Sequence, residues 1–216
     1  VGMENLPPER TEQFEELLQL SMPKVSVEGF HRGVPTVVSN NPAGAQSALD
    51  YLYELGHRNI GIITVTGENE ASIQRLNGYR QFLKNHALPE RSELIFPARS
   101  YSYEAGEEIA DAVSSHPELT AVFCIYDEIS LGLIAGLRRR GIEIPRDLSL
   151  VSFDDITIAQ YSALTTVRQN RKQIGMLAAE KLIAMIEKQD VAIPENTLVD
   201  TTLIVRKSCR NISVSR

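Results

Sequence analysis

Two adjacent carboxylates, Asp154 and Asp155, end the apolar run LSLVSF at residues 148–153. The β-branched and large apolar residues of this run are typical of a strand that is covered on both faces. Because an unpaired charge is very costly to bury, the two carboxylates must lie where the strand leaves the sheet. In open parallel α/β sheets, that edge is also where ligands bind. The sequence therefore predicts a binding site beside this aspartate pair.

Polar and aromatic side chains follow the other expected strands and should share this edge. Arg75 falls near the start of a helix, where the helix dipole disfavours a cation, so its presence needs a separate reason. A guanidinium that reaches into a cleft would suit hydroxyl-rich or anionic ligands, and a solvated surface arginine is an equal alternative. Two aromatic rings, an arginine and carboxylates are what a sugar or nucleoside site requires. The candidates are Asn69, Arg75, Tyr101, Tyr126, Asp127, Asp154 and Asp155.

Helix capping is the alternative role of these carboxylates, because each precedes a helical or turn segment. We expect Asp127 to cap the helix that begins at Glu128. Capping would also suit Asp155, which leaves Asp154 as the ligand candidate. The three arginines of LRRRG at residues 137–141 stand at a helix C-terminus before a glycine, so we assign them to balancing the helix dipole and not to binding nucleic acid.

The elements that must position these residues alternate between strand and helix along the chain. Segments with apolar residues at helical spacing are separated by short apolar runs that are typical of buried strands. Strands separated by helices of this length pair in parallel through right-handed crossovers, so we predict a doubly wound α/β sheet. The expected strands are 24–27, 36–39, 59–65, 93–96, 120–125 and 148–153, and the expected helices are 44–55, 72–86, 103–114 and 128–140.

The last part of the chain changes character. It is extended at 163–169, forms a long amphipathic helix at 171–188 and is extended again at 196–206. A late helix between two extended segments would allow the chain to cross to the lobe formed by its first strands and then to return to the other lobe. We therefore expect two lobes that are joined by several crossings, with a cleft between them.

The expected helix at 128–140 is apolar on nearly every side. One face can meet the sheet, and the other needs a partner, because a helix that is apolar all round is buried all round. We therefore predict a homodimer with Leu131, Ile134 and Ala135 near its interface.

Composition and the motifs that are missing narrow the classes of function. The net charge of −6 and the pI of about 5.3 argue against a broad nucleic-acid or membrane-binding face on this chain. Only Cys124 and Cys209 are present, and no stretch resembles a membrane span or a signal peptide, so a reducing cytoplasm is expected. The nucleophile elbow, the phosphate loop and the dinucleotide fingerprint are absent, and the histidines are isolated, so no enzyme, metal or cofactor is expected.

Several segments together resemble the LacI/GalR family of bacterial transcription regulators, specifically their periplasmic-binding-protein-like effector domain. They are VPTVVSNN, YLYELGHRNIGII, QRLNGYRQFL, TAVFCIYDEISLGLIAGLRRRGIEIPRDLSLVSFDD, ALTTVRQ and LIVRKSC, in family order over nearly the whole chain. The resemblance implies a two-lobed fold with three crossings and a small effector, a sugar or a related metabolite, bound between the lobes. A solute-binding protein of a transport system with the same fold is the alternative.

The resemblance also implies roles for individual residues. The family's effector-binding residues fall on Arg75, Asp154, Tyr101, Gln169 and, for an aromatic that some members use, Phe123. Tyr126 departs from the pattern, since relatives often have a small or amide residue there. Asn170 also departs, because proline often follows the crossing glutamine in the family.

The family pattern further implies which parts of a regulator this chain contains. In such regulators an N-terminal helix-turn-helix binds operator DNA, and the helix-turn-helix and the first strands and helices of the N-terminal lobe have no counterpart here. Val1 resembles the end of a strand in the middle of that lobe. We expect a partial N-terminal lobe at 1–56 with 169–197 and a C-terminal lobe at 57–168 with 198–216.

Overall fold

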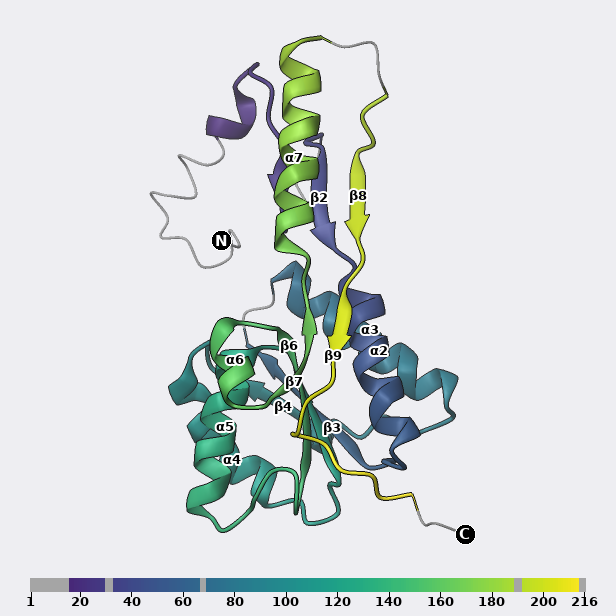
Figure 1. Cartoon of the computed structure of the whole chain (residues 1–216), viewed down its shortest axis with the longest axis vertical. Coiled ribbons are helices and arrows are strands. Elements are labelled where there is room, and N and C mark those ends of the chain that lie inside the picture. Colours follow the sequence, from purple (N-terminus) through teal and green to yellow (C-terminus); the bar gives the residue numbers. More distant parts are fainter. Residues whose placement is uncertain (1–15, 30–32, 67–68, 189–191, 214–216) are drawn as a thin grey trace.

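The strands in the part of the chain that the structure describes form two separate sheets (Figure 1). The computed structural model describes residues 16–29, 33–66, 69–188 and 192–213. The larger sheet has the strand order β4-β3-β5-β6-β7-β9, and its strands are parallel except for β9, which runs antiparallel to β7. These strands are β3 (Ile60–Val65), β4 (Ile95–Ala98), β5 (Ala121–Cys124), β6 (Ser149–Asp154), β7 (Thr165–Arg168) and β9 (Thr202–Ile204).

Helices cover both faces of the larger sheet (Figure 1). α2 (Asn41–Glu54) packs with α3 (Glu70–Asn85) on one side, and α4 (Tyr103–Ser114) packs with α5 (Asp127–Arg139) on the other. The backbones of α4 and α5 approach each other closely at Gly132. A Cβ added to this glycine would lie only 1.8 Å from the Tyr103 carbonyl oxygen. The chain adds β4 on one side of β3 and then crosses over to add β5 on the other side. The strand order therefore reverses between β3 and β5, and ligands of open α/β sheets bind at such a switch point.

The smaller sheet has the parallel order β1-β2-β8. Its strands are β1 (Ser26–Val27), β2 (Thr36–Ser39) and β8 (Asn196–Val199), and α7 (Arg171–Ile186) runs beside them (Figure 1). A small core of Val37, Ile174, Ala178 and Val199 joins the helix to the sheet. The predicted α/β fold with two sheets of mainly parallel strands is therefore confirmed.

Three of the described segments connect the two sheets. Asn40 alone separates β2 from α2, Gln169 and Asn170 separate β7 from α7, and Asp200 and Thr201 separate β8 from β9. Because each connection is only one or two residues long, it restricts the positions of the residues on either side of it.

The expected lobe boundaries differ from the structure at α2 and β8. The buried face of α2, with Ala45, Ala48, Leu49 and Leu52, belongs to the core of the larger sheet, so the first boundary follows Ser39 and not residue 56. β8 lies wholly in the smaller sheet, which moves the last boundary from 197 to the connection after Val199. Residues 1–15 and 214–216 of the expected lobes, including Val1, lie outside the described residues.

The remaining differences are local. β4 begins two residues later than the predicted strand at 93–96, because Ser92–Leu94 form a 3₁₀ turn. A short helix that was not predicted, α6 (Thr157–Tyr161), follows β6. Among the described residues, no helix has the length and apolar character that crossing a membrane would require.

Candidate functional site

Arg75 is a buried arginine in the second turn of α3, with only 1% of the residue exposed. Its Nε donates to Oδ1 of Asn41 at 2.9 Å, and its Nη1 donates to the Ile125 carbonyl oxygen at 2.6 Å. The guanidinium carbon lies 3.7 Å from the centre of the Phe153 ring. The alternative of a solvated surface arginine is therefore wrong.

Asp154, the last residue of β6, lies beside this guanidinium. Its Oδ1 is 3.3 Å from Nη1 of Arg75 and accepts a hydrogen bond of 3.0 Å from Nε2 of Gln169. Burial raises the pKa of the Asp154 carboxyl from its ordinary 3.8 to about 6, and the positive charge of Arg75 opposes this rise. The structure thus brings three of the predicted site residues together at the carboxyl edge of the larger sheet.

The predicted tyrosines form an aromatic wall next to the ion pair. The ring centres of Tyr101 and Tyr126 are 4.6 Å apart in an edge-to-face arrangement, and the guanidinium of Arg75 lies 4.8 Å from the Tyr126 ring centre. Nδ2 of Asn69 donates to the Tyr126 hydroxyl at 3.2 Å, while Oδ1 of Asn69 accepts from the Ser72 amide and caps α3. Asn69 therefore both starts its helix and orients one of the rings.

The other two candidate carboxylates have structural partners, and neither caps the helix expected for it. Asp127 is the first residue of α5, but its carboxylate accepts from the Thr166 hydroxyl at 2.7 Å and from the Ile156 amide at 2.9 Å. Burial raises its pKa, and these hydrogen bonds oppose the rise. Asp155 pairs with Arg168 and Arg206 at 2.6 and 2.7 Å. The capping predictions were wrong because tertiary partners outcompete the local amides.

Phe123 packs in the core of the larger sheet. It is fully buried in the middle of β5, opposite Ile62 and Val151 in the neighbouring strands. The aromatic that packs on Arg75 from within the sheet is Phe153, which the sequence indicated only as a strand residue. The structure shows Phe123 in core packing, and the effector role implied for it stays a prediction.

Asn41 is the site residue that sequence reasoning missed. Asn40 is the N-cap of α2, and Asn41 is 2% exposed and directs its amide toward Arg75, Gln74 and the Ser39 carbonyl. In the sequence, Asn40 and Asn41 both precede Pro42, and either one suits a helix N-cap by its type and position. A helix has a single N-cap residue, so one of the two asparagines had to have another role.

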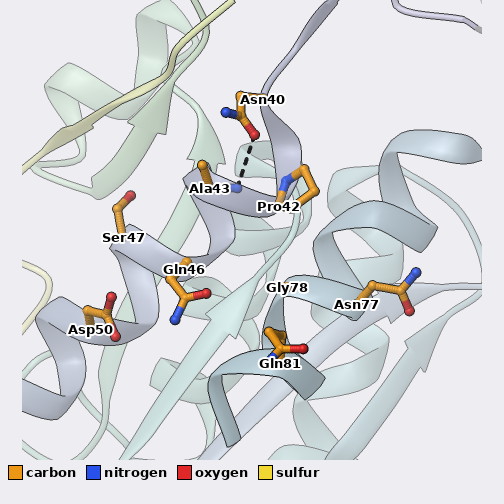
Figure 2. A pocket seen from close by; sticks show the side chains of 9 residues that line it. All are labelled: Asn40, Pro42, Ala43, Gln46, Ser47, Asp50, Asn77, Gly78 and Gln81. Carbon is orange, nitrogen blue, oxygen red and sulfur yellow. Dashed lines mark hydrogen bonds between the residues drawn. The ribbon is translucent and has the colours of Figure 1, made fainter. Parts of the chain in front are cut away.

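A groove of about 640 Å³ lies between α2 and α3, apart from this cluster. Figure 2 shows its amide side chains, including Gln46, Asn77 and Gln81, and the hydrogen bond from the Ala43 amide to Asn40 that caps α2. None of the predicted site residues lines the groove.

Two of the three arginines of the LRRRG segment form ion pairs with the neighbouring helix α4. Arg139 pairs with Glu107 at 2.5 Å, and Arg140 pairs with Asp111. Gly141 has a φ of +77°, as expected for the glycine that ends a helix. The assignment of these arginines to the helix end and not to nucleic acid agrees with these contacts.

The predicted interface residues Leu131, Ile134 and Ala135 are half-buried on α5. α4 covers part of the helix surface that the sequence left open, through the close approach at Gly132. These three side chains stay partly accessible, so the homodimer remains a prediction.

The family model of the periplasmic binding protein-like domain matches residues 49–209. The chain belongs to this family. Among curated members, it is 36% identical over 181 residues to the HTH-type transcriptional repressor CytR of Escherichia coli (strain K12), which covers 82% of this chain and 52% of CytR. It is 31% identical over 185 residues to the probable HTH-type transcriptional repressor ExuR of Bacillus subtilis (strain 168), which covers 84% of this chain and 55% of ExuR.

The chain spans about half the length of the curated relatives it matches. A solved structure of a LacI family transcriptional regulator from Enterococcus faecium with bound ribose superposes with a TM-score of 0.82 at 23% identity, over 94% of this chain and 75% of that chain. This likeness shows the fold of a periplasmic-binding-protein-like domain. Together with the repressor relatives, it confirms the resemblance to LacI-family regulators.

Proposed function

We propose that this chain is the effector-sensing part of a LacI/GalR-like transcriptional regulator in the cytoplasm. It binds a sugar or a nucleoside-like metabolite between its lobes and thereby changes the affinity of the whole protein for operator DNA. The DNA is bound by an N-terminal helix-turn-helix outside this chain. The repressor relatives and the ribose in the Enterococcus faecium regulator support this class of function.

One observation carries the proposal. The buried pair of Arg75 and Asp154 is hydrogen-bonded to Asn41, which directly follows the connection at Asn40, and to Gln169, which is part of the connection between β7 and α7. A ligand that takes over these bonds acts on two connections at once. Because a ligand shifts an equilibrium only by its difference in affinity for the two states, this arrangement suits a ligand-driven change in lobe orientation.

The chemistry of the cluster suits a hydroxylated ring. The guanidinium of Arg75 and the carboxylate of Asp154 can bond to hydroxyl groups, and the Tyr101 and Tyr126 rings offer apolar faces to C–H groups or to a base. Both charged groups belong to one pair, so a neutral ligand leaves their charges balanced.

The test is calorimetry of the full-length protein with D-ribose, D-glucose, uridine and adenosine. We expect one of these compounds to bind, and Arg75→Ala to weaken its binding by about 1.5 to 3 kcal/mol if the guanidinium bonds a charged group, and by less for neutral hydroxyls. Arg80→Ala, on the exposed face of the same helix, and Asn77→Ala, in the groove between α2 and α3, are the matched controls. Equal affinity of Arg75→Ala and wild type would place the site elsewhere.

A solute-binding protein of a transport system is the competing function for this fold. A gel-shift assay of the full-length protein on the DNA upstream of its own gene separates the two. Sequence-specific binding that responds to the bound metabolite supports the regulator, and an export signal without DNA binding supports the transport protein.

A further inference from the structure

Two consecutive non-glycine residues at the end of β6 have left-handed backbone conformations. Asp154 has a φ of +115° and Asp155 has a φ of +52°. Aspartate tolerates the second value, but the first lies outside the small left-handed region open to residues with a Cβ. Such a conformation persists only where the surrounding structure imposes it.

The contacts of Asp155 supply that restraint. Its side chain is 2% exposed and accepts from Nε of Arg168 at 2.6 Å and from Nη2 of Arg206 at 2.7 Å. Its backbone amide donates to the Thr166 hydroxyl at 3.3 Å, and that hydroxyl donates to Asp127. The turn is therefore held through both its carboxylate and its backbone.

The two arginines come from different parts of the chain. Arg168 is the last residue of β7, immediately before Gln169, and Arg206 follows β9 and also donates to the Leu164 carbonyl oxygen at 2.7 Å. Arg168 and Gln169 are adjacent, but they bond to different carboxylates, Asp155 and Asp154. The end of β7 thus holds both aspartates.

We infer that Asp155, Arg168 and Arg206 form a clamp that imposes the left-handed turn at residues 154–155 and so aims the Asp154 carboxylate at Arg75. Asp155 is then a positioning residue for the effector site. The clamp also ties that site to the strands β7 and β9, which lead to two of the three connections between the sheets. This inference rests on the proposed function for its biological meaning, but its geometry can be tested without any effector.

The primary readout is the titration of Asp154, followed by carbon-13 NMR of its carboxyl group in the full-length protein. In the wild type we expect a pKa of about 6, which reflects burial. In Arg206→Gln, the loss of a nearby positive charge would by itself raise the pKa of Asp154. If the clamp fails and Asp154 turns into water, the pKa instead falls by about one unit or more toward its ordinary value.

A lowered pKa of Asp154 in Arg206→Gln supports the clamp, and an unchanged or raised pKa overturns it. Arg168→Gln, at a half-exposed position, is the second variant and should give the same direction even if Arg206→Gln folds poorly. Asp147→Asn breaks an exposed pair with Arg146 and should leave the pKa of Asp154 unchanged.

A crystal structure of Asp155→Asn adds a direct check, because asparagine keeps the size of the side chain and tolerates the left-handed region. Separation of Arg75 and Asp154 beyond ion-pair distance supports the clamp, and an unchanged pair contradicts it. If none of the tested metabolites binds, the proposed function fails while the pKa result still decides the clamp.

Discussion

Nη1 of Arg75 lies 3.3 Å from Oδ1 of Asp154, with 1% and 13% of the two side chains exposed. Loss of one partner from such a buried pair leaves the other charge without compensation. We therefore expect Arg75→Met to lower the free energy of unfolding by about 3 to 5 kcal/mol at pH 7.5. Urea denaturation measures this loss.

Arg80→Met is the matched control for that measurement, because Arg80 lies on the same helix and its pair with Glu90 is about half exposed. Exposed pairs contribute about 0 to 1 kcal/mol, so the control should lose little stability. Equal losses of unfolding free energy in the two variants would show that the buried pair stabilises the fold no more than the exposed pair does.

Protonation of Asp154 should stabilise the folded protein at acid pH. Its pKa in the folded state is about 6, above the ordinary 3.8, so the folded protein holds this proton more tightly than the unfolded chain. The contribution is full below pH 4 and is lost as the pH rises through 6. Between pH 4 and 7, the unfolding free energy of wild type relative to Asp154→Asn should therefore decline, and a difference that grows with pH would refute this.

His57 should have the opposite effect on how the unfolding free energy depends on pH. Its ring is buried and bonds to the Thr120 hydroxyl at 3.0 Å and to the Arg210 carbonyl oxygen at 3.1 Å, and desolvation lowers its pKa below 6.5. The unfolded chain then binds the proton more readily, so stability falls as the pH drops below about 6.5. Urea titrations at pH 5 and 7 should show a smaller change for His57→Gln than for wild type, and an equal change in the two proteins would contradict this prediction.

Gly132 should not tolerate even one added carbon. A Cβ there would lie 1.8 Å from the Tyr103 carbonyl oxygen, and backbone cannot move aside as a flexible side chain can. We expect Gly132→Ala to lower the unfolding free energy by about 3 kcal/mol or more. Gly175→Ala in α7 meets no atom within 4 Å, so it should gain about 0.5 to 1 kcal/mol from helix propensity. Thermal melts compare the two, and similar melting temperatures would contradict the close packing of α4 on α5.

The homodimer predicted from α5 can be tested in the full-length protein. Leu131→Glu places a charge on a half-buried apolar position, so it should convert a dimer to monomers at micromolar concentration in analytical ultracentrifugation. Gln81→Glu, on the opposite side of the larger sheet, should leave the dimer intact. A wild-type protein that sediments as a monomer would refute the prediction.

The long helices and buried strands could be predicted because their apolar positions repeat with a clear period. α6 was missed because five residues are too few to show a helical period. The predicted strand at 93–96 stopped before Pro97, yet β4 contains this proline. β4 is an edge strand, where a residue without an amide hydrogen costs no ladder bond.

The site was predictable to the level of a sheet edge. Arg75, Asp154, Tyr101 and Tyr126 converge because the carboxyl ends of parallel strands meet there. The partners of Asn41, Asp127 and Asp155 were not predictable, because a polar side chain pairs with whatever the fold places beside it. The lobe boundary was missed for a related reason, since a connection of one residue leaves no compositional mark.

That one-residue connection limits how this chain can change. Each residue added to a helix end turns the following side chains by about 100°. Asn41 and Arg75 lie on two helices that pack together on the larger sheet, so an insertion beside Asn40 would instead rotate β2 and the smaller sheet relative to this pair, even if both sheets stayed intact. Surface loops of the domain can lengthen or shorten, but the joint at Asn40 has a fixed length.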